Sequence, residues 1–367
     1  MPTKYSPLSF HLSRRQVLKG AGATAGAFAA GSLIGGSLKS AEELLNPAPV
    51  KAATFYKGCD ISWAQQMANY GYFWKNASDQ GTTGSADTQI NYLCSILKSY
   101  NINAIRLRTW VNPSTDPVNG CCNQADTVAM AYLMKEMGLP VDIDFHFGDT
   151  WNSVGTQNPP AAWANMTLSQ MESALGTYVY NFMEALKASG VTPTWVQLGN
   201  EINSGICHPL GGVNYPSQMT ALLMAGYNNV KAVFPSAQCI IHLAQPQDSG
   251  PIETFMSAYD GNGGKLDILG FSSYGSSSLA VSLANDMLGF GKTYGKPVMQ
   301  VEFGGPVSSS GTATAATEYI QTLRNGGGLG VFYWEPECYS PFCTYTEGAW
   351  ETTEEPDTAI MNAIQSA

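Results

Sequence analysis

The chain has 367 residues, of which 44% are hydrophobic, 11% aromatic and only 13% charged. So apolar a chain can bury a large core, which excludes an intrinsically disordered protein and allows either two domains or one large barrel. The net charge of −10 argues against a nucleic-acid or anionic-membrane partner, because such partners require a cationic surface.

The first 52 residues resemble an export signal. Arg14 and Arg15 form a twin-arginine motif, and an uncharged run rich in Gly and Ala follows over residues 20–38. A membrane span is the alternative, but Gly and Ala contribute little transfer free energy. Small residues around Ala52 predict cleavage there. We therefore expect residues 1–52 to be removed and residues 53–367 to form the functional domain of a secreted or periplasmic protein.

Removal of residues 1–52 takes away six basic and two acidic residues and leaves a net charge of −14. All eight cysteines lie in the remaining part, which fits an oxidising compartment. They allow 105 pairings, and only Cys338 and Cys343 stand out as a local pair. Since no Cys-x-x-Cys or His-x-x-x-His spacing occurs, we predict no metal site.

Short apolar, β-branched runs alternate with helical patterns along the rest of the chain. The predicted strands are Tyr56–Ile61, Ala104–Trp110, Pro140–Phe145, Thr194–Gly199, Cys239–Leu243, Ile268–Ser272, Val298–Glu302 and Gly330–Trp334. The clearest helical patterns between them are Ala125–Glu136, Leu168–Ala188 and Met219–Val233. Eight such units in about 315 residues predict a single closed (β/α)₈ TIM barrel. An open doubly wound sheet would need a Gly-rich phosphate loop after the first strand, and none is present there.

Polar and aromatic residues stand at the carboxyl ends of the predicted strands, where barrels of this class have their active sites. They are Asp60, Arg106, Arg108, His146, Asp149, Trp151, Asn200, Glu201, His242, Tyr274, Glu302 and Trp334. Aromatic faces can stack on sugar rings, amides can bind hydroxyls, and two carboxyl groups can cleave a glycosidic bond. The sequence therefore predicts a site for sugar chemistry.

Glu201 and Glu302 each follow an apolar strand. We expect strands four and seven to lie on opposite sides of the ring, so that the two carboxyls face each other across a glycosidic bond. A separation of about 5 Å would give retention of configuration and a wider one inversion. A structural ion pair with an arginine is the alternative for either glutamate. Satisfied structural roles remain open for His146 and His242, as does barrel-top packing for Trp334.

Four segments carry a resemblance to a known family. They are KGCDIS at 57–62, NAIRLRTWVNP at 103–113, DFHFGDTW at 144–151 and WVQLGNEI at 195–202. These segments resemble glycoside hydrolase family 53, the endo-β-1,4-galactanases that cut the arabinogalactan side chains of pectin. The resemblance continues through Val301-Glu302 and covers most of residues 55–335.

The resemblance implies a role for each central residue. Glu201 would be the acid/base and Glu302 the nucleophile of a retaining mechanism, with Arg106 keeping the pKa of Glu302 low. Asn200 would bind the 2-hydroxyl of the sugar, and Tyr274 would donate to Glu302. The sequence departs from the family after the fifth strand, at Ala244-Gln245-Pro246, after Tyr274, and in the final loop. The catalytic pair is therefore better supported than the identity of the glycan.

We expect a cofactor-free, monomeric enzyme whose partner is a polysaccharide. Acidic residues at 347–357 could hold a structural calcium ion, but a solvated run of charges is the better explanation, and we predict no calcium site. Two other functions stay open. One is a related barrel hydrolase acting on mannan or cellulose, and the other is a glycan-binding barrel without activity.

Overall fold

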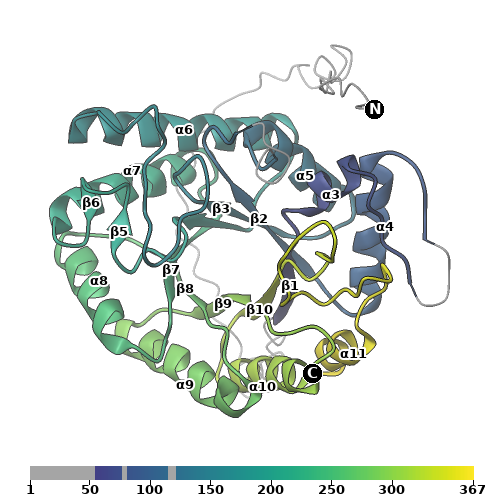
Figure 1. Cartoon of the computed structure of the whole chain (residues 1–367). Helices are drawn as coiled ribbons and strands as arrows, with labels where there is room; N and C mark the ends of the chain where they lie inside the picture. The colour runs from purple at the N-terminus through teal and green to yellow at the C-terminus, as the bar shows by residue number, and fades with distance from the viewer. Residues whose placement is uncertain (1–53, 77–80, 115–120) are drawn as a thin grey trace, which may run out of the picture. The chain divides into compact units, whose positions relative to one another are not determined.

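Eight parallel strands alternate with helices and close into a barrel (Figure 1). The computed structural model describes residues 54–76, 81–114 and 121–367. Thr54–Ala367 form one compact unit, and the predicted export signal at 1–52 lies outside the described residues. The predicted TIM barrel is therefore confirmed for the described part of the chain.

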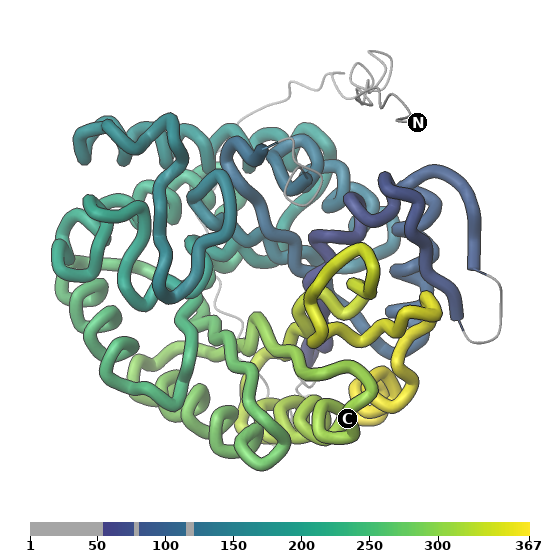
Figure 2. Tube along the Cα trace, viewed as in Figure 1, coloured from purple at the N-terminus to yellow at the C-terminus, as the bar shows by residue number. Residues whose placement is uncertain are grey.

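The barrel strands follow the predicted runs to within one residue at either end. They are β1 (Tyr56–Asp60), β2 (Ala104–Thr109), β3 (Val141–Phe145), β4 (Trp195–Leu198), β7 (Gln238–Ala244), β8 (Ile268–Ser272), β9 (Val298–Phe303) and β10 (Gly330–Trp334). They pair in this order, and β10 closes the ring against β1. The closure brings the first and last strands of the chain side by side (Figure 2). A separate two-stranded ribbon, β5 (Gly205–Ile206) and β6 (Gly211–Gly212), follows β4.

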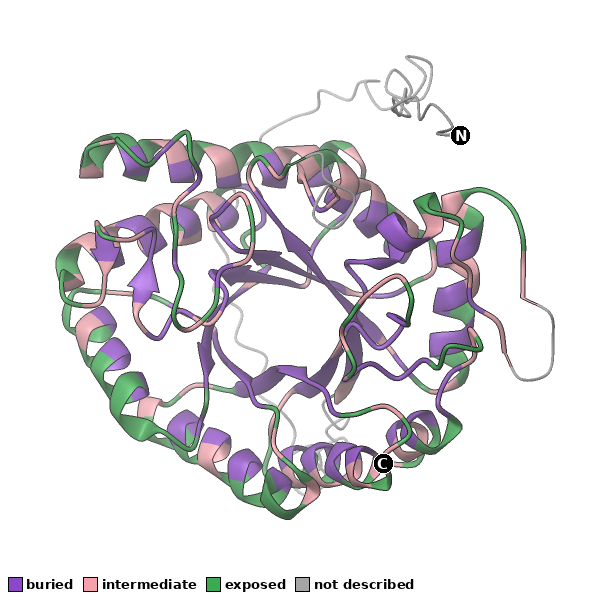
Figure 3. Ribbon diagram, in the orientation of Figure 1, coloured by how far each residue is buried: buried purple, intermediate pink, exposed green. Residues whose placement is uncertain are grey.

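Helices surround the strands and expose only their outer faces (Figure 3). They are α3 (Ala64–Asn69), α4 (Ala86–Ser99), α5 (Gln124–Glu136), α6 (Leu168–Ala188), α7 (Pro216–Val233), α8 (Ser249–Gly261), α9 (Ser277–Tyr294), α10 (Ser310–Asn325) and α11 (Thr358–Ser366). The three helices predicted from periodicity are confirmed. Helix α6 begins where predicted because Thr167 and Gln170 form a capping box that satisfies its first backbone N–H groups.

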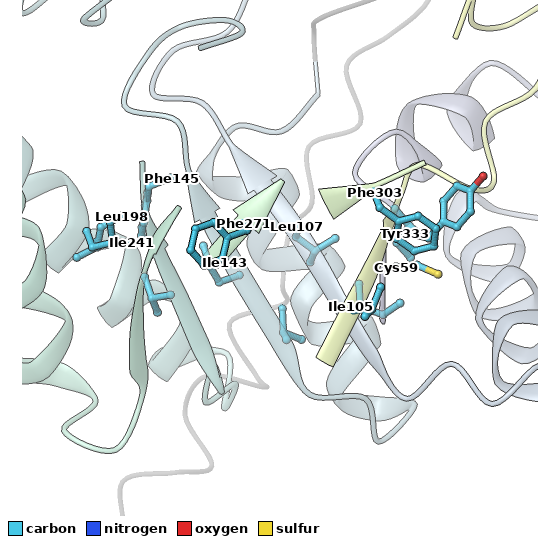
Figure 4. Packing of buried hydrophobic residues seen from close by; sticks show 14 of the residues in the cluster. Cys59, Ile105, Leu107, Ile143, Phe145, Leu198, Ile241, Phe271, Phe303 and Tyr333 are labelled. Atoms are coloured by element: carbon cyan, nitrogen blue, oxygen red, sulfur yellow. The ribbon is translucent and has the colours of Figure 1, made fainter. Parts of the chain in front are cut away.

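Side chains alternate along each strand between two packed layers. Ile105 and Leu107 of β2 and Ile143 and Phe145 of β3 point outward under the helices (Figure 4). The other set points into the barrel, where an apolar plug fills the interior; its members are Ala104, Trp195, Ile240, Ile268, Met299, Val301 and Phe332. Arg106, in phase with Ala104, belongs to the inward set one step nearer the carboxyl end. The barrel is therefore apolar at one end and charged at the mouth.

Strand β9 breaks this alternation at Glu302. Val298 and Phe303 pack in the outer layer, whereas Met299 and Val301 belong to the inner plug. Strict alternation would then send Glu302 outward, but the pairing register shifts beside it against both neighbouring strands. Such an irregularity re-aims a side chain, and Glu302 contacts Arg106 inside the mouth. A β-bulge therefore places this carboxyl in the site.

Strands β4 and β9 are not on opposite sides of the ring. Only β7 and β8 separate them on one side, so they are three positions apart in a ring of eight. The expectation of opposite strands was wrong by one position. Glu201 and Glu302 still face the same hollow, because each lies at the carboxyl end of its strand.

The predicted local disulfide between Cys338 and Cys343 is present in the loop after β10. The other six cysteines are free thiols, and all of them except Cys121 are buried. A framework of four bridges is therefore absent. Cys59, Cys94, Cys207 and Cys239 instead pack as small apolar residues of the core.

Candidate active site

A hollow of about 390 Å³ opens at the carboxyl ends of the strands. Its lining residues are Trp63, His146, Trp151, Asn152, Ser153, Asn200, Glu201, Tyr274, Glu302 and Trp334. Seven of the residues expected from the sequence lie in this lining. Five others do not: Asp60, Arg106 and His242 are buried beneath the floor, Arg108 is buried behind the lining, and Asp149 lies in a neighbouring loop. Sequence reasoning missed Trp63, Asn152 and Ser153.

Glu302 is held by two donors at the floor of the hollow. One Oε accepts from Arg106 Nη2 at 2.8 Å and the other accepts from the Tyr274 hydroxyl at 3.2 Å. Both contacts were expected from the sequence, and both are confirmed. Together they orient the carboxyl and stabilise its charged form.

The expected low pKa of Glu302 is, however, contradicted. Burial raises the pKa of this carboxyl to about 8, and Arg106 opposes the rise without cancelling it. The residue is only 6% exposed, and its charge lies near the carboxylates of Glu201, Asp144 and Asp60. One arginine charge shared among several carboxylates cannot offset the loss of hydration at Glu302.

Arg106 is the centre of this shared network. Its guanidinium also contacts Asp60 at 2.7 Å, Asp144 at 2.8 Å and Asn200 Oδ1 at 3.0 Å. Burial alone would raise the pKa of Asp144, but Arg106 and His146 outweigh it and hold that pKa at about 2. Asp60 therefore supports Arg106 rather than reaching substrate.

Glu201 lies just beyond β4 in a strained backbone conformation. Its φ is +51°, in the left-handed region that side chains other than glycine rarely adopt. Its backbone N–H donates to His242 Nδ1 at 3.3 Å, and its Oε1 accepts from the Ser272 hydroxyl at 2.6 Å. Strain held by such contacts is typical of functional positions.

His146 and His242 both contact the buried polar residues beneath the hollow. Burial, and then the charge of Arg106, lower the pKa of His242 well below its usual value, so this ring is neutral and its Nδ1 can accept from Glu201. His146 contacts both the buried network and the hollow: its Nε2 lies 3.0 Å from Asp144, and the residue also lines the hollow. The structural reading left open for His242 is therefore the one its contacts support.

Three tryptophans form an aromatic wall on one side of the hollow. Trp63, Trp151 and Trp334 contact one another at ring-centroid distances of 5.3 to 5.8 Å. Behind them the guanidinium of Arg108 lies 4.5 Å from the Trp151 ring and 5.0 Å from the Trp63 ring, and it pairs with the buried Glu335. The contact is a cation–π interaction, so Arg108 stabilises the wall from the buried side.

Asp149 was predicted as a site residue but holds loops together, whereas Trp63 lines the hollow and was not predicted. Asp149 accepts from the backbone N–H groups of Asn112 and Ala161 and thus ties loops together. Trp63 stands three residues after Asp60 at the end of β1, so a wider search past each strand end would have found it.

No group of three potential metal ligands occurs among the residues described in the structure. None of the helices described there is long and apolar enough to span a membrane. In the acidic final loop, Asp357 caps α11 by accepting from Ala359 and Ile360, and Glu354 pairs with Lys75. These contacts account for part of the run of charges there.

Two carboxyl groups beside an aromatic wall at the mouth of a parallel barrel define a glycoside hydrolase of the barrel class. The sequence profile of glycosyl hydrolase family 53 matches residues 56–363. The chain therefore belongs to glycosyl hydrolase family 53, as its motifs predicted.

Individual relatives agree with this assignment. The arabinogalactan endo-beta-1,4-galactanase A of Emericella nidulans is 28% identical over 312 residues, which cover 78% of this chain and 85% of that protein. A solved structure from a study of two fungal beta-1,4-galactanases has a TM-score of 0.75 at 25% identity and covers 86% of this chain and 100% of the other. The family 53 catalytic domain of Ignisphaera aggregans has the same fold, with a TM-score of 0.75 at 24% identity, covering 87% of this chain and 98% of that domain.

Proposed function

We propose that the protein is a retaining endo-β-1,4-galactanase that hydrolyses β-1,4-galactan, the polymer of pectic arabinogalactan side chains. The observation that carries the proposal is the convergence of Glu201 and Glu302 on one hollow beside three tryptophans. The substrate is proposed from relatives that are named arabinogalactan endo-beta-1,4-galactanases.

Glu302 is assigned as the nucleophile. It is the deeper of the two carboxyls, and Arg106 and Tyr274 are placed to stabilise its negative charge. In the first step its carboxylate attacks the anomeric carbon, and the bond to the leaving oxygen breaks.

Glu201 is assigned as the acid/base. It donates its proton to the leaving oxygen in the first step. In the second step it removes a proton from the water that releases the sugar from Glu302. The reactive form thus has the proton on Glu201 and the charge on Glu302, and it needs no cofactor.

Asn200 is assigned to the sugar hydroxyl next to the reacting carbon. Its Oδ1 accepts from Arg106, and its Nδ2 donates to the carbonyl of Asn152 at 2.9 Å. An amide nitrogen carries a second hydrogen, which is left for the 2-hydroxyl. The network that orients Glu302 therefore orients Asn200 as well.

The catalytic assignments are tested with Glu201→Gln and Glu302→Gln. Each variant should lose galactan cleavage by at least a thousandfold while still binding galactan, because the amide keeps the shape and loses the chemistry. Proton NMR of the first product should show the β-anomer. Full activity in either variant would refute the assignment of Glu201 and Glu302 as the catalytic pair. An α-anomer as first product would refute the retaining mechanism.

The glycan is tested by reducing-end release from galactan, mannan, xylan and cellulose. Galactan should be cleaved fastest. Faster cleavage of mannan or cellulose would make the protein a related endo-β-glycanase instead, and binding without any cleavage would make it a glycan-binding barrel.

We also propose that residues 1–52 export the folded protein by the twin-arginine route and that the mature enzyme is a monomer. Arg14→Lys combined with Arg15→Lys should keep the protein in the cytoplasm, as followed by cell fractionation. Light scattering of the mature chain should give the mass of one copy. Export of the double variant or a dimeric mass would contradict these proposals.

A further inference from the structure

A second hollow adjoins the first on the side of Glu201. It has a volume of about 450 Å³ and lies between the loops that follow β7 and β8 and the start of α9. Glu201 and Tyr274 line both hollows, whereas Glu302 and the three tryptophans line only the first. We call the second one the side hollow.

The chemistry of the proposed reaction gives the side hollow a place along the substrate. The sugar that is attacked must lie against Glu302, and the oxygen that leaves must lie against Glu201. The chain beyond that oxygen therefore extends away from Glu302, past Glu201. The side hollow lies on that path. This step rests on the proposed function.

The wall of the side hollow differs in chemistry from the aromatic wall. One face of α9 supplies Leu279, Ser282, Leu283 and Asp286, at the spacing of one helix face. The loop after β7 adds Gln245 and Gln247. Tyr274 is the one aromatic residue in the lining formed by the described residues. Binding there depends on hydrogen bonds to hydroxyls more than on stacking.

Asp286 is the notable member of this wall. It is half-buried, and it has no ion pair or side-chain hydrogen bond with the residues described around it. The described lining also contains neither lysine nor arginine. A carboxylate in this setting can accept hydrogen bonds from sugar hydroxyls, and it repels a second carboxylate at short range.

We propose that the side hollow binds the leaving-group sugar and that Asp286 makes it selective for a neutral unit over a sugar acid. Asp286 accepts hydroxyl hydrogen bonds from the neutral sugar. A carboxylate-bearing sugar in the same place would face both Asp286 and Glu201 without a cation nearby.

The test uses two forms of β-1,4-galactopentaose that differ only in charge at the reducing end. One carries a terminal alditol, and the other carries the corresponding aldonate. Mass spectrometry of the products gives the rate of cleavage at the bond that places this terminal unit directly after the cut. Wild-type protein should cleave the alditol at this bond at least tenfold faster than the aldonate.

Asp286→Asn keeps the size of the side chain and removes its charge. It should reduce the alditol preference to threefold or less, and high salt should narrow the wild-type preference as well. Asp260→Asn, an exposed position on α8 outside the lining of both hollows, is the matched control and should keep the wild-type ratio.

The outcomes separate this inference from the proposed function. If wild-type protein cleaves neither pentaose, the galactan assignment fails and the inference fails with it. If wild-type protein cleaves both forms and Asp286→Asn leaves their ratio unchanged, only the role of Asp286 is overturned.

Discussion

Replacing Glu302 by glutamine should stabilise the protein and abolish its activity, and the stabilisation should grow with pH. Glu302 is 6% exposed, and burial raises the pKa of its carboxyl from 4.5 to about 8. Between these two pH values the folded protein keeps a proton on Glu302 that the unfolded chain has released. The free energy of unfolding therefore falls as pH rises through this window.

The magnitude follows from the width of that window. Each pH unit between 4.5 and about 8 lowers the stability contributed by this group by about 1.4 kcal/mol. The total approaches about 5 kcal/mol at pH 8. Glutamine never ionises, so Glu302→Gln removes the loss. Its amide oxygen can still accept from Arg106, and Asp60 and Asp144 still balance the guanidinium.

Urea unfolding of both proteins at pH 5, 6.5 and 8 measures the effect. The variant should be close to wild type at pH 5 and several kcal/mol more stable at pH 8. Glu253→Gln, at an exposed position on α8, is the control and should show no such pH-dependent gain. A variant that is no more stable than wild type at pH 8, or a difference that does not change with pH, would refute the reasoning.

Three further predictions concern the same network. Glu201→Gly should be about 1 kcal/mol more stable than Glu201→Ala, because only glycine adopts a φ of +51° without strain; equal melting temperatures would contradict this. Arg106→Met should lose about 3 to 5 kcal/mol in urea unfolding, because Asp144 and Glu302 are left without a buried arginine and Asp60 keeps only Arg108, at 4.0 Å; a loss below 1 kcal/mol would show that the network contributes little. Finally, kcat/KM for galactan should fall as pH rises through about 8, because the carboxyl pair must keep one proton for the leaving oxygen and loses it there; a rate independent of pH between 7 and 9 would contradict this.

Much of the floor of the site could be predicted because strand ends are visible in the sequence. Asn200 and Glu201 follow an apolar run, and Arg106 stands at an alternating position of β2. In a parallel barrel all such positions meet at one mouth. Trp63, by contrast, lies beyond the strand end in a turn before α3, where no periodicity indicates which way a side chain points.

For Glu302 the sequence predicted the contacts correctly but the direction of the pKa shift wrongly, and the reason is physical. Its partners Arg106 and Tyr274 could be named from the motifs, but the balance between burial and ion pairing could not. Burial is a property of the packed structure, and Arg106 is shared with Asp60 and Asp144. The pKa therefore rose where the pair alone would have lowered it.

The sequence by itself determined the barrel, the positions of its strands and the residue types at its mouth, because these depend on periodicity along the chain. The tertiary structure decided how these residues act. The bulge in β9 turns Glu302 into the mouth, and the left-handed backbone at Glu201 is held by a histidine from the next strand around the ring. The side hollow likewise exists only where two loops and one helix meet. Each of these features depends on contacts between residues distant in sequence, which no local pattern records.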